Sequence, residues 1–409
     1  MSGVRFLHIA DLHLDSPFIG LSHVGEKLHK IIQESTFASL AACVQIAIRE
    51  QVDFVLIAGD IYDSDDQSVK AQARFYQAMK ELEQAAIPVF MIHGNHDYLK
   101  GNRETLLLPE NVTVFPEKVA KYLYQTKNGT QVDIQGFSYG SRHVMDSQLD
   151  KYEKQPADFH IGLLHGSERT HADGHDVYAP FTTNELRSKG FDYWALGHIH
   201  KRMLLEESGP VIYYPGNIQG RNRKESGEKG ATLVQLDSQG AALTFYPTAP
   251  IQWETVTLTI ESAEVINTFF QQALEMIESY AVQDGSYLLD MEVTVTAEHP
   301  TVSANDLLEL VQDNCKQTET SFVWVNSLRL ITKKTSQTSF LETHLIGEEW
   351  QAASNELQDE STFFQVMEQL YFHKGINRFL TDITEAERTE LLTEANQYLE
   401  KALAELEDD

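Results

Sequence analysis

The sequence is poor in cysteine and has no long apolar run. It holds two cysteines, Cys43 and Cys315, in 409 residues. That number excludes a disulfide framework and indicates a reducing compartment, so we expect a cytoplasmic protein. No stretch approaches about 18 consecutive apolar residues, and the N-terminus has no charged segment followed by an apolar run. We therefore expect a protein that neither crosses nor enters a membrane.

Basic side chains are also scarce. The chain has 32 lysines and arginines against 61 aspartates and glutamates, a formal net charge of −29. Over the whole chain, this charge argues against binding of nucleic acid by bulk attraction. Most of the excess negative charge lies in the later part of the sequence, since residues 1–250 have a net charge of −7 and residues 251–409 one of −22. The two parts therefore need separate interpretation.

The hydrophobic pattern predicts three segments. Residues 1–250 alternate short apolar runs with longer amphipathic ones, which indicates an α/β fold with a layered β-sheet sandwich flanked by helices. Residues 251–335 are predicted to form a small α+β capping domain, and residues 336–409 a helical C-terminal tail. The strands expected in the first segment are Val4–Ala10, Phe54–Ala58, Val89–His93, Val132–Phe137, His160–Leu164, Tyr193–Leu196, Val211–Tyr214, Ala231–Leu236 and Leu243–Tyr246.

Five short polar segments follow apolar strands within one or two residues. They are Asp11-Leu12-His13, Gly59-Asp60-Ile61-Tyr62-Asp63, Gly94-Asn95-His96-Asp97, His165-Gly166 and Gly197-His198-Ile199-His200. Strands that end at one sheet edge deliver the residues that follow to one place. In extended chain, residues i and i+2 point the same way, so D-x-H and H-x-H can face one ion or two neighbouring ions. Any one segment could be a structural turn with satisfied histidines, but five at strand ends favour a metal site.

The side chains in these segments are carboxylates, imidazoles and an amide, without thiolate. Such ligands suit Mn²⁺, Fe²⁺ or Zn²⁺ better than a structural cysteine-rich zinc site. Seven candidate ligands are too many for one ion and about right for two that share a bridging carboxylate. Two ions roughly 3.5–4 Å apart suit in-line attack at phosphorus. We predict two divalent ions, with Mn²⁺, Fe²⁺, Zn²⁺ or Mg²⁺ as the candidates.

Taken in order, D-x-H, GD-x-x-D, GNHD, H and GH-x-H resemble the motifs of the calcineurin-like metallophosphoesterases. The resemblance implies a first metal held by Asp11, His13, Asp60 and His200, with Asp60 bridging to a second metal held by Asn95, His165 and His198. It also implies that His96 protonates the leaving oxygen and that Asp97 orients His96. The sequence agrees, because His96 adjoins a ligand without being needed as one.

Local sequence features indicate which members of this family the chain resembles. GDIYDSDD lacks the arginine that Ser/Thr protein phosphatases carry after its second aspartate, and the third segment ends in Asp97 where they have glutamate. The opening HIADLHLDSPF and the segment YPGNIQGR at 214–221 resemble SbcD-type DNA repair exonucleases, most closely their YhaO branch. That resemblance implies manganese-dependent hydrolysis of DNA phosphodiesters, an SbcC-like or YhaN-like ATPase partner and a homodimer. Arg221 and Asn222 are then the candidate substrate contacts.

Other interpretations stay open from sequence alone. The chain could be a nucleotide or small-molecule phosphoesterase whose C-terminal region is a specificity cap, or a scaffold without enzymatic activity, which the intact ligand set disfavours. Residues 201–230 have a net charge of +2, which is either a locally positive groove or a mixed solvated surface.

The last predicted helix begins near Asp382 and Glu385 and runs to about Glu407. It carries an apolar seam of Leu392, Ala395, Leu399, Ala402 and Leu406. This seam docks to the ATPase in one interpretation and packs on the protein's own helices in the other.

Overall fold

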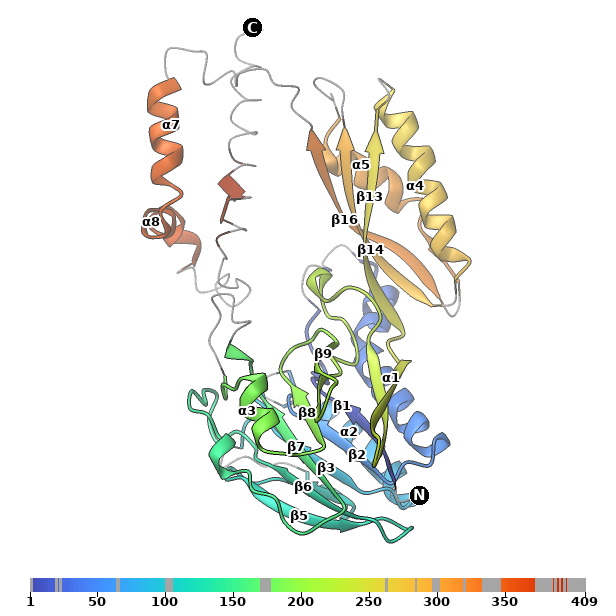
Figure 1. The fold of residues 1–409 in the computed structure, drawn as a ribbon. Coiled ribbons are helices and arrows are strands. Elements are labelled where there is room, and N and C mark those ends of the chain that lie inside the picture. The colour runs from blue at the N-terminus through green and yellow to red at the C-terminus, as the bar shows by residue number, and fades with distance from the viewer. Residues whose placement is uncertain are drawn as a thin grey trace, which may run out of the picture. The chain divides into compact units, whose positions relative to one another are not determined.

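The computed structural model describes residues 3–18, 21, 24–63, 67–99, 106–169, 178–261, 264–283, 285–295, 302–318, 321–332 and 347–371, and residues 385, 388, 389, 391, 392 and 395. The chain forms two compact units, Met1–Thr332 and Lys333–Asp409 (Figure 1). In the second unit, the structure describes helices α7 (Gly347–Glu356) and α8 (Glu360–Tyr371). The predicted last helix and its apolar seam lie mostly outside the described residues.

Two six-stranded mixed sheets form the frame of the first unit. One has the order β12-β11-β1-β2-β3-β4, in which β1 to β4 run parallel and β11 runs antiparallel to both its neighbours. Its strands are β1 (Val4–Ile9), β2 (Phe54–Ala58), β3 (Val89–Ile92), β4 (Val112–Val114), β11 (Gly230–Asp237) and β12 (Gly240–Pro247).

The other sheet has the order β5-β6-β7-β8-β10-β9, in which β6, β7, β8 and β10 run parallel and the two edge strands antiparallel. Its strands are β5 (Ala120–Gln125), β6 (Gln131–Gly136), β7 (Phe159–His165), β8 (Tyr193–Gly197), β9 (Met203–Glu206) and β10 (Val211–Tyr214).

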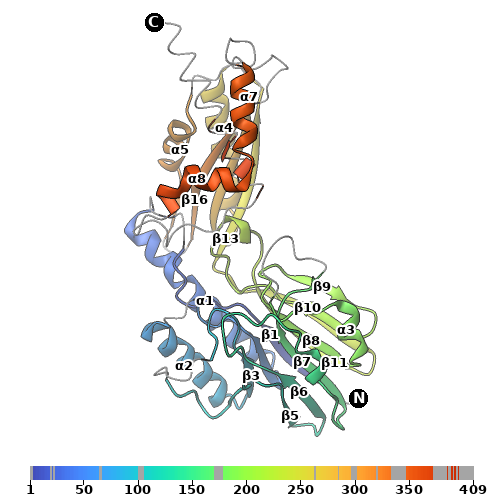
Figure 2. The same ribbon diagram turned by 90° about the vertical axis from the view of Figure 1, so that its left-hand side faces the viewer.

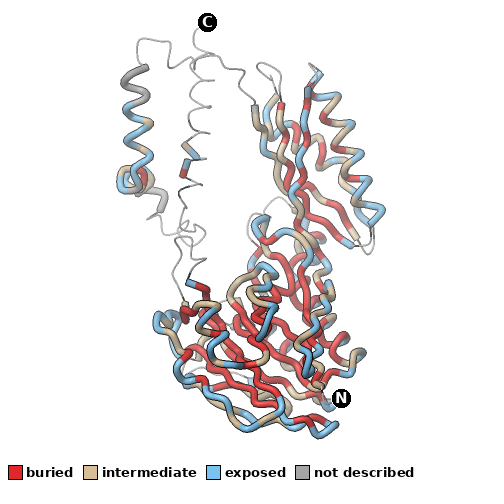
Figure 3. The backbone as a smooth tube through the Cα atoms, in the orientation of Figure 1, coloured by how far each residue is buried: buried red, intermediate tan, exposed pale blue. Residues whose placement is uncertain are grey.

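The two sheets pack face to face, and helices cover their outer faces (Figure 2). Phe6, Phe54 and Leu56 of one sheet meet Ile134 and Ile161 of the other in a dry core. Helices α1 (Glu26–Arg49) and α2 (Val69–Gln84) cover the first sheet, and α3 (Thr183–Ser188) covers the second. Buried residues accordingly run along the strands (Figure 3). The predicted sandwich flanked by helices is confirmed.

Helix α1 is long and apolar enough to cross a membrane when judged by length and composition alone. Just over half of its most apolar window is buried inside the protein. Leu40, Cys43 and Ala47 pack against the outer face of the first sheet, and burial raises the pKa of the Cys43 thiol to about 12. In this structure α1 is therefore a core helix, and Cys43 is a buried apolar side chain.

A third sheet follows at Ile251 within the first unit. Its strands are β13 (Ile251–Ile260), β14 (Ser286–Val295), β16 (Phe322–Thr332) and β15 (Lys316–Gln317), in that spatial order. Helices α4 (Val265–Ala281) and α5 (Ala304–Gln312) pack on one face of this sheet through Phe269, Ile277 and Leu307. The described part of residues 251–335, predicted as a capping domain, contains these strands and helices, and the residues up to Thr332 belong to the first compact unit.

The sequence pattern does not predict the short or peripheral strands β4, β5, β9 and β15. Strand β5 shows the reason, because three of its six residues are only partly buried and the other three are exposed. It is an edge strand whose only neighbour in the sheet is β6, with which it forms an antiparallel hairpin. A strand held by backbone pairing rather than by a buried face leaves no clear alternation to detect.

Candidate metal centre

The five predicted segments follow β1, β2, β3, β7 and β8, and the structure brings them together. They come from two packed sheets, not from one sheet edge as expected, since β1 to β3 belong to the first sheet and β7 and β8 to the second. Backbone bonds tie neighbouring segments to each other: the Asp11 amide donates to the Gly59 carbonyl at 3.1 Å and the His13 amide to the Asp60 carbonyl at 3.0 Å. Residues nearly 200 positions apart therefore share one site.

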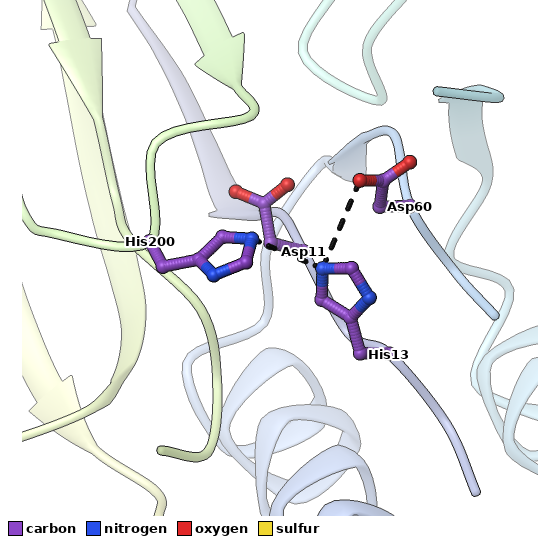
Figure 4. Close-up of side chains that lie close together, drawn as sticks. All are labelled: Asp11, His13, Asp60 and His200. Atoms are coloured by element: carbon purple, nitrogen blue, oxygen red, sulfur yellow. Dashed lines mark hydrogen bonds and ion pairs between the residues drawn. The ribbon is translucent and has the colours of Figure 1, made fainter. Parts of the chain in front are cut away.

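The first group of donors is Asp11, His13, Asp60 and His200, whose ligand atoms all lie within 4.8 Å of one another (Figure 4). His13 Nε2 lies 3.1 Å from His200 Nε2 and 3.7 Å from Asp60 Oδ2. Three of the four residues are buried, and His200 is partly exposed. These four residues, which the resemblance implies for the first metal, therefore lie together and could hold a metal ion.

A second group of donors lies on the other side of Asp60. His165 Nε2 is 3.0 Å from Asn95 Oδ1 and 3.4 Å from Asp60 Oδ2. The ring of His198 lies edge-on to that of His165, with 5.2 Å between the ring centroids. Asp60 Oδ2 thus lies within 4 Å of an imidazole nitrogen from each group, which is the place of a bridging carboxylate.

The His165 ring is fixed from behind. Its Nδ1 lies 2.9 Å from the Ala58 carbonyl oxygen, so Nδ1 carries the proton and the Nε2 lone pair faces Asn95 and Asp60. The buried hydroxyl of Tyr139 donates to the His165 carbonyl at 2.7 Å, and that of Tyr214 to the Gly166 carbonyl at 2.6 Å. These contacts hold the end of β7 in place.

Two glycines leave the space in which this ring and Asp60 lie. A Cβ on Gly94 would be 2.2 Å from Asp60 Oδ1 and 2.7 Å from His165 Nε2. A Cβ on Gly197 would be 1.8 Å from the Ala58 carbonyl oxygen. The glycines that precede Asn95 and His198 in the motifs are therefore required by close packing around His165 and Asp60.

Four predicted ligands have backbone in the left-handed region, with φ of 51° at Asp11, 42° at His13, 48° at Asp60 and 100° at His198. Each residue other than glycine in such a conformation costs the folded protein about 1–3 kcal/mol of stability, and residues strained in this way cluster at functional sites. The Asp11 carboxylate accepts from the His198 amide at 2.9 and 3.1 Å, so one ligand fixes the backbone of another.

The electrostatics of the two groups suit a cation. Burial would raise the pKa of Asp60, but His165 and His13 hold it well below its usual range. Burial would lower the pKa of His165, yet Asp60 and Asp11 raise it to about 9. The buried carboxylates thus favour positive charge beside them, which a proton on His165 supplies when no cation is bound and which a divalent ion would supply at the Nε2 lone pair of the neutral ring. The oxygen and nitrogen donors that converge here are those that divalent ions need. The residues present therefore fit divalent metal ions.

His96 is at the site, but its partner differs from the prediction. Its amide donates to Asp60 Oδ1 at 3.0 Å, and its Nδ1 lies 2.8 Å from the Asp63 carbonyl oxygen. Asp97 instead accepts from the amides of Ile61 and Gly94, both at 2.8 Å, and its Oδ2 lies 3.1 Å from His93 Nδ1. The prediction that Asp97 orients the His96 ring is therefore wrong, because that carboxylate is committed to the backbone of two ligand-bearing loops.

The two predicted substrate contacts have other partners. The side chain of Asn222 caps the short helix η3 (Arg223–Glu225) by accepting from the Lys224 amide at 2.9 Å. Arg221 reaches the metal centre, where Nη1 contacts Asp63 and Nη2 lies 3.1 Å from Glu225 Oε1. The guanidinium thus contacts protein carboxylates in the structure.

Glu225 was missed by sequence reasoning. It is buried, and its Oε1 lies 2.7 Å from His200 Nδ1. Burial would raise its pKa, but His200 and Arg221 hold it far below the usual range. The only signal in the sequence is an acidic residue within a basic stretch, which does not distinguish it from its neighbours.

Comparison with known proteins agrees with the geometry. Residues 4–202 match the calcineurin-like phosphoesterase family. The whole chain is similar to an uncharacterized metallophosphoesterase, YhaO, of Bacillus subtilis, at 34% identity over 414 residues and all of both chains. The DNA double-strand break repair proteins Mre11 of Sulfurisphaera tokodaii and Methanocaldococcus jannaschii are each 27% identical over 58% of this chain, and over 60% and 63% of their own length. The chain therefore belongs to the calcineurin-like metallophosphoesterases, a family of metal-dependent phosphoesterases.

Proposed function

We propose that this protein hydrolyses phosphodiester bonds of DNA with two divalent ions, as the nuclease subunit of a repair complex. The observation that carries the two-metal part is the position of Asp60, whose Oδ2 lies between the His13 and His165 nitrogens at 3.7 and 3.4 Å. DNA as the substrate is supported by relatives named for DNA double-strand break repair. The activity proposed is that of an exonuclease, with endonuclease activity an additional possibility to assay.

The chain's own residues divide the work. Asp11, His13, Asp60 and His200 would hold one ion, and Asp60, Asn95, His165 and His198 the other. When bound, the ions would supply a nucleophile at neutral pH and offset the charge that develops on the phosphoryl oxygens. Their ligands are held by backbone bonds and strained turns, so little reorganisation is needed on reaction. Manganese is the ion we propose, since the donors are nitrogen and oxygen.

His96 is placed to move a proton. Because its Nδ1 faces the Asp63 carbonyl oxygen at 2.8 Å, Nδ1 stays protonated and Nε2 is the atom that gains or loses a proton. His96 has contacts near both donor groups, since its ring lies edge-on to His13 and its amide donates to Asp60. We assign to Nε2 the protonation of the leaving oxygen, a role worth roughly 10²–10⁴-fold in rate.

The basic residues near His200 offer few phosphate contacts. Arg221 is paired with two carboxylates, Lys229 is buried and donates to the His200 carbonyl at 2.8 Å, and Arg202 lies over the ring of Phe245. These three basic side chains thus contact other groups of the protein. We therefore expect this chain alone to bind DNA weakly. The logarithm of its binding constant should fall only slowly with the logarithm of the salt concentration, because each phosphate contact contributes a slope of roughly 0.7–0.9.

A partner is part of the proposal for the same reason. We propose that an SbcC-like or YhaN-like ATPase supplies DNA affinity, that the C-terminal region binds it, and that the nuclease works as a homodimer in the cytoplasm. The acidic excess after residue 250, a net charge of −22, suits a basic partner surface and lies outside the metal-binding segments. Co-purification of the two full-length proteins, with and without residues 336–409, tests this part.

The central experiment is a nuclease assay on the purified full-length chain with Mn²⁺. Linear DNA labelled at either end and bis-p-nitrophenyl phosphate are offered in parallel, with and without the ATPase. We expect both to be hydrolysed. His96→Ala should slow DNA hydrolysis by about 10²–10⁴-fold and hydrolysis of the small ester much less, because p-nitrophenolate leaves without being protonated. Hydrolysis of the small ester or of nucleotides alone, with DNA intact even when the ATPase is present, would replace the nuclease by a small-molecule phosphoesterase.

A further inference from the structure

Behind the first group of donors lies a second layer of three charged side chains, Asp63, Arg221 and Glu225, which we call the outer layer. Their side chains are 17%, 14% and 9% exposed. Asp63 and Glu225 each lie beside the Nδ1 of a different metal-ligand histidine, and Arg221 contacts both carboxylates. The layer therefore connects two ligands that come from β1 and β8.

Glu225 sets the His200 ring. Its Oε1 lies 2.7 Å from His200 Nδ1, which places the proton on Nδ1 and leaves the Nε2 lone pair facing the donor group. The other oxygen, Oε2, accepts from the Arg221 amide and from Asn217 Nδ2, both at 2.8 Å. These bonds to Oε2 fix the carboxylate in the orientation in which Oε1 accepts a hydrogen bond from His200.

Asp63 contacts His13 more loosely than Glu225 contacts His200, because the contact is an ion pair without hydrogen-bond geometry. Its Oδ1 lies 3.3 Å from His13 Nδ1, while His13 Nε2 points to His200 Nε2 and Asp60. Asp63 follows β2, whereas His13 follows β1, so the two residues come from different segments of the chain. The strongest partner of Asp63 in the structure is the Arg221 guanidinium, through Nη1.

Arg221 joins the two halves of the layer. Nη1 contacts Asp63, while Nη2 lies 3.1 Å from Glu225 Oε1 and Nε 3.4 Å from Glu225 Oε2. A planar guanidinium presents several donors in fixed directions, so it can hold two carboxylates at a set separation, which a lysine ammonium cannot do as well. Charge-assisted bonds of this kind are the stronger class of hydrogen bond.

We propose that Arg221 is a positioning residue that clamps Asp63 and Glu225 and, through them, aims the Nε2 atoms of His13 and His200 at the first metal. It takes the place of the direct substrate contact expected from sequence. The inference rests on the metal centre of the proposed function and not on DNA as the substrate. It predicts that changes at Arg221 alter metal binding before any substrate is present.

The test measures Mn²⁺ binding to the full-length protein without substrate, by titration calorimetry and by the electron paramagnetic resonance signal of free Mn²⁺. Outer contacts to metal-ligand histidines are worth about 10–100-fold in metal affinity. We expect Arg221→Gln to weaken one of two Mn²⁺ ions by that factor and leave the other near its wild-type affinity. The Mn²⁺ affinity of Arg221→Lys should lie between that of the wild type and that of Arg221→Gln. Arg223→Gln removes an exposed arginine two residues away and should bind Mn²⁺ as the wild type does.

A double variant separates the clamp from a general structural effect. Because Arg221 acts through the carboxylates, Arg221→Gln combined with Glu225→Gln should cost little more in Mn²⁺ affinity than the more damaging single change. Unchanged Mn²⁺ affinity in Arg221→Gln, with a raised KM for DNA, would overturn the proposal and restore the substrate contact. Additive losses would also overturn it. If Arg221→Gln does not fold, Glu225→Gln carries the test, and full Mn²⁺ affinity there would contradict the clamp.

Discussion

Replacing Gly94 by alanine tests the geometry of the metal centre with a single methyl group. The new Cβ would lie 2.2 Å from Asp60 Oδ1 and 2.7 Å from His165 Nε2. Non-bonded carbon and oxygen atoms do not approach within about 3 Å, so Asp60 Oδ1 would have to retreat by roughly 0.8 Å. Gly94 does not have a positive φ, so the clash, not backbone strain, is the perturbation.

A misplacement of about 1 Å at a catalytic centre can cost on the order of 10²-fold in rate. For Gly94→Ala we expect a loss of that size in hydrolysis of bis-p-nitrophenyl phosphate, together with weaker binding of both Mn²⁺ ions, because Asp60 belongs to both donor groups. Turnover, metal content by mass spectrometry and far-UV circular dichroism are measured on the same preparations.

Gly25→Ala is the matched control for this prediction. A Cβ on Gly25 meets nothing within 4 Å, and its φ of −57° suits alanine. This variant should keep wild-type metal content and turnover. Two tightly bound Mn²⁺ ions and unchanged turnover in Gly94→Ala would refute the packing argument and with it the bridging position of Asp60.

Three further predictions concern the same centre and the tail. His96→Ala should retain both metals yet lose about 10²–10⁴-fold in turnover of DNA, measured by steady-state kinetics beside metal analysis; loss of both ions would show that His96 is a ligand. Asp60→Ala should lose at least one ion, since its Oδ2 faces both donor groups, and an unchanged two-metal stoichiometry would contradict the bridge. Deleting residues 336–409, which fall in the second compact unit, should keep simple-ester hydrolysis and remove association with the ATPase in size-exclusion chromatography; loss of metals or of the folded state would make the tail part of the core.

The central strands and the polar segments that follow them were predictable because their signals are local. Phe54–Ala58 is a short, wholly buried apolar run directly before Gly59 and Asp60, and the prediction matches β2 residue for residue. The same pattern, an apolar strand followed by polar motif residues, marks the other four segments. The polar residues that follow β1, β2, β3, β7 and β8 therefore named the candidate ligands without any knowledge of how the strands pair.

The partners of these ligands were not predictable in the same way. Asp97 stands next to His96 in the sequence, yet its carboxylate bonds the amides of Ile61 and Gly94. Glu225 lies in an unremarkable charged stretch, yet it sets the tautomer of His200. Adjacent side chains in a turn point in different directions, and which direction each takes depends on the segments packed around it.

The sequence by itself determined the chemistry of the centre: which donors are present, in what order, and that the excess of acidic over basic residues lies mainly outside the metal-binding part. The tertiary structure alone decided that two sheets share the site, that Asp60 faces both groups, and that Arg221 contacts carboxylates. The physical reason is the distance along the chain over which each kind of signal acts. Periodicity and spacing act over a few residues, whereas His13 and His200 are 187 positions apart and meet only because sheet pairing and core packing bring β1 and β8 together.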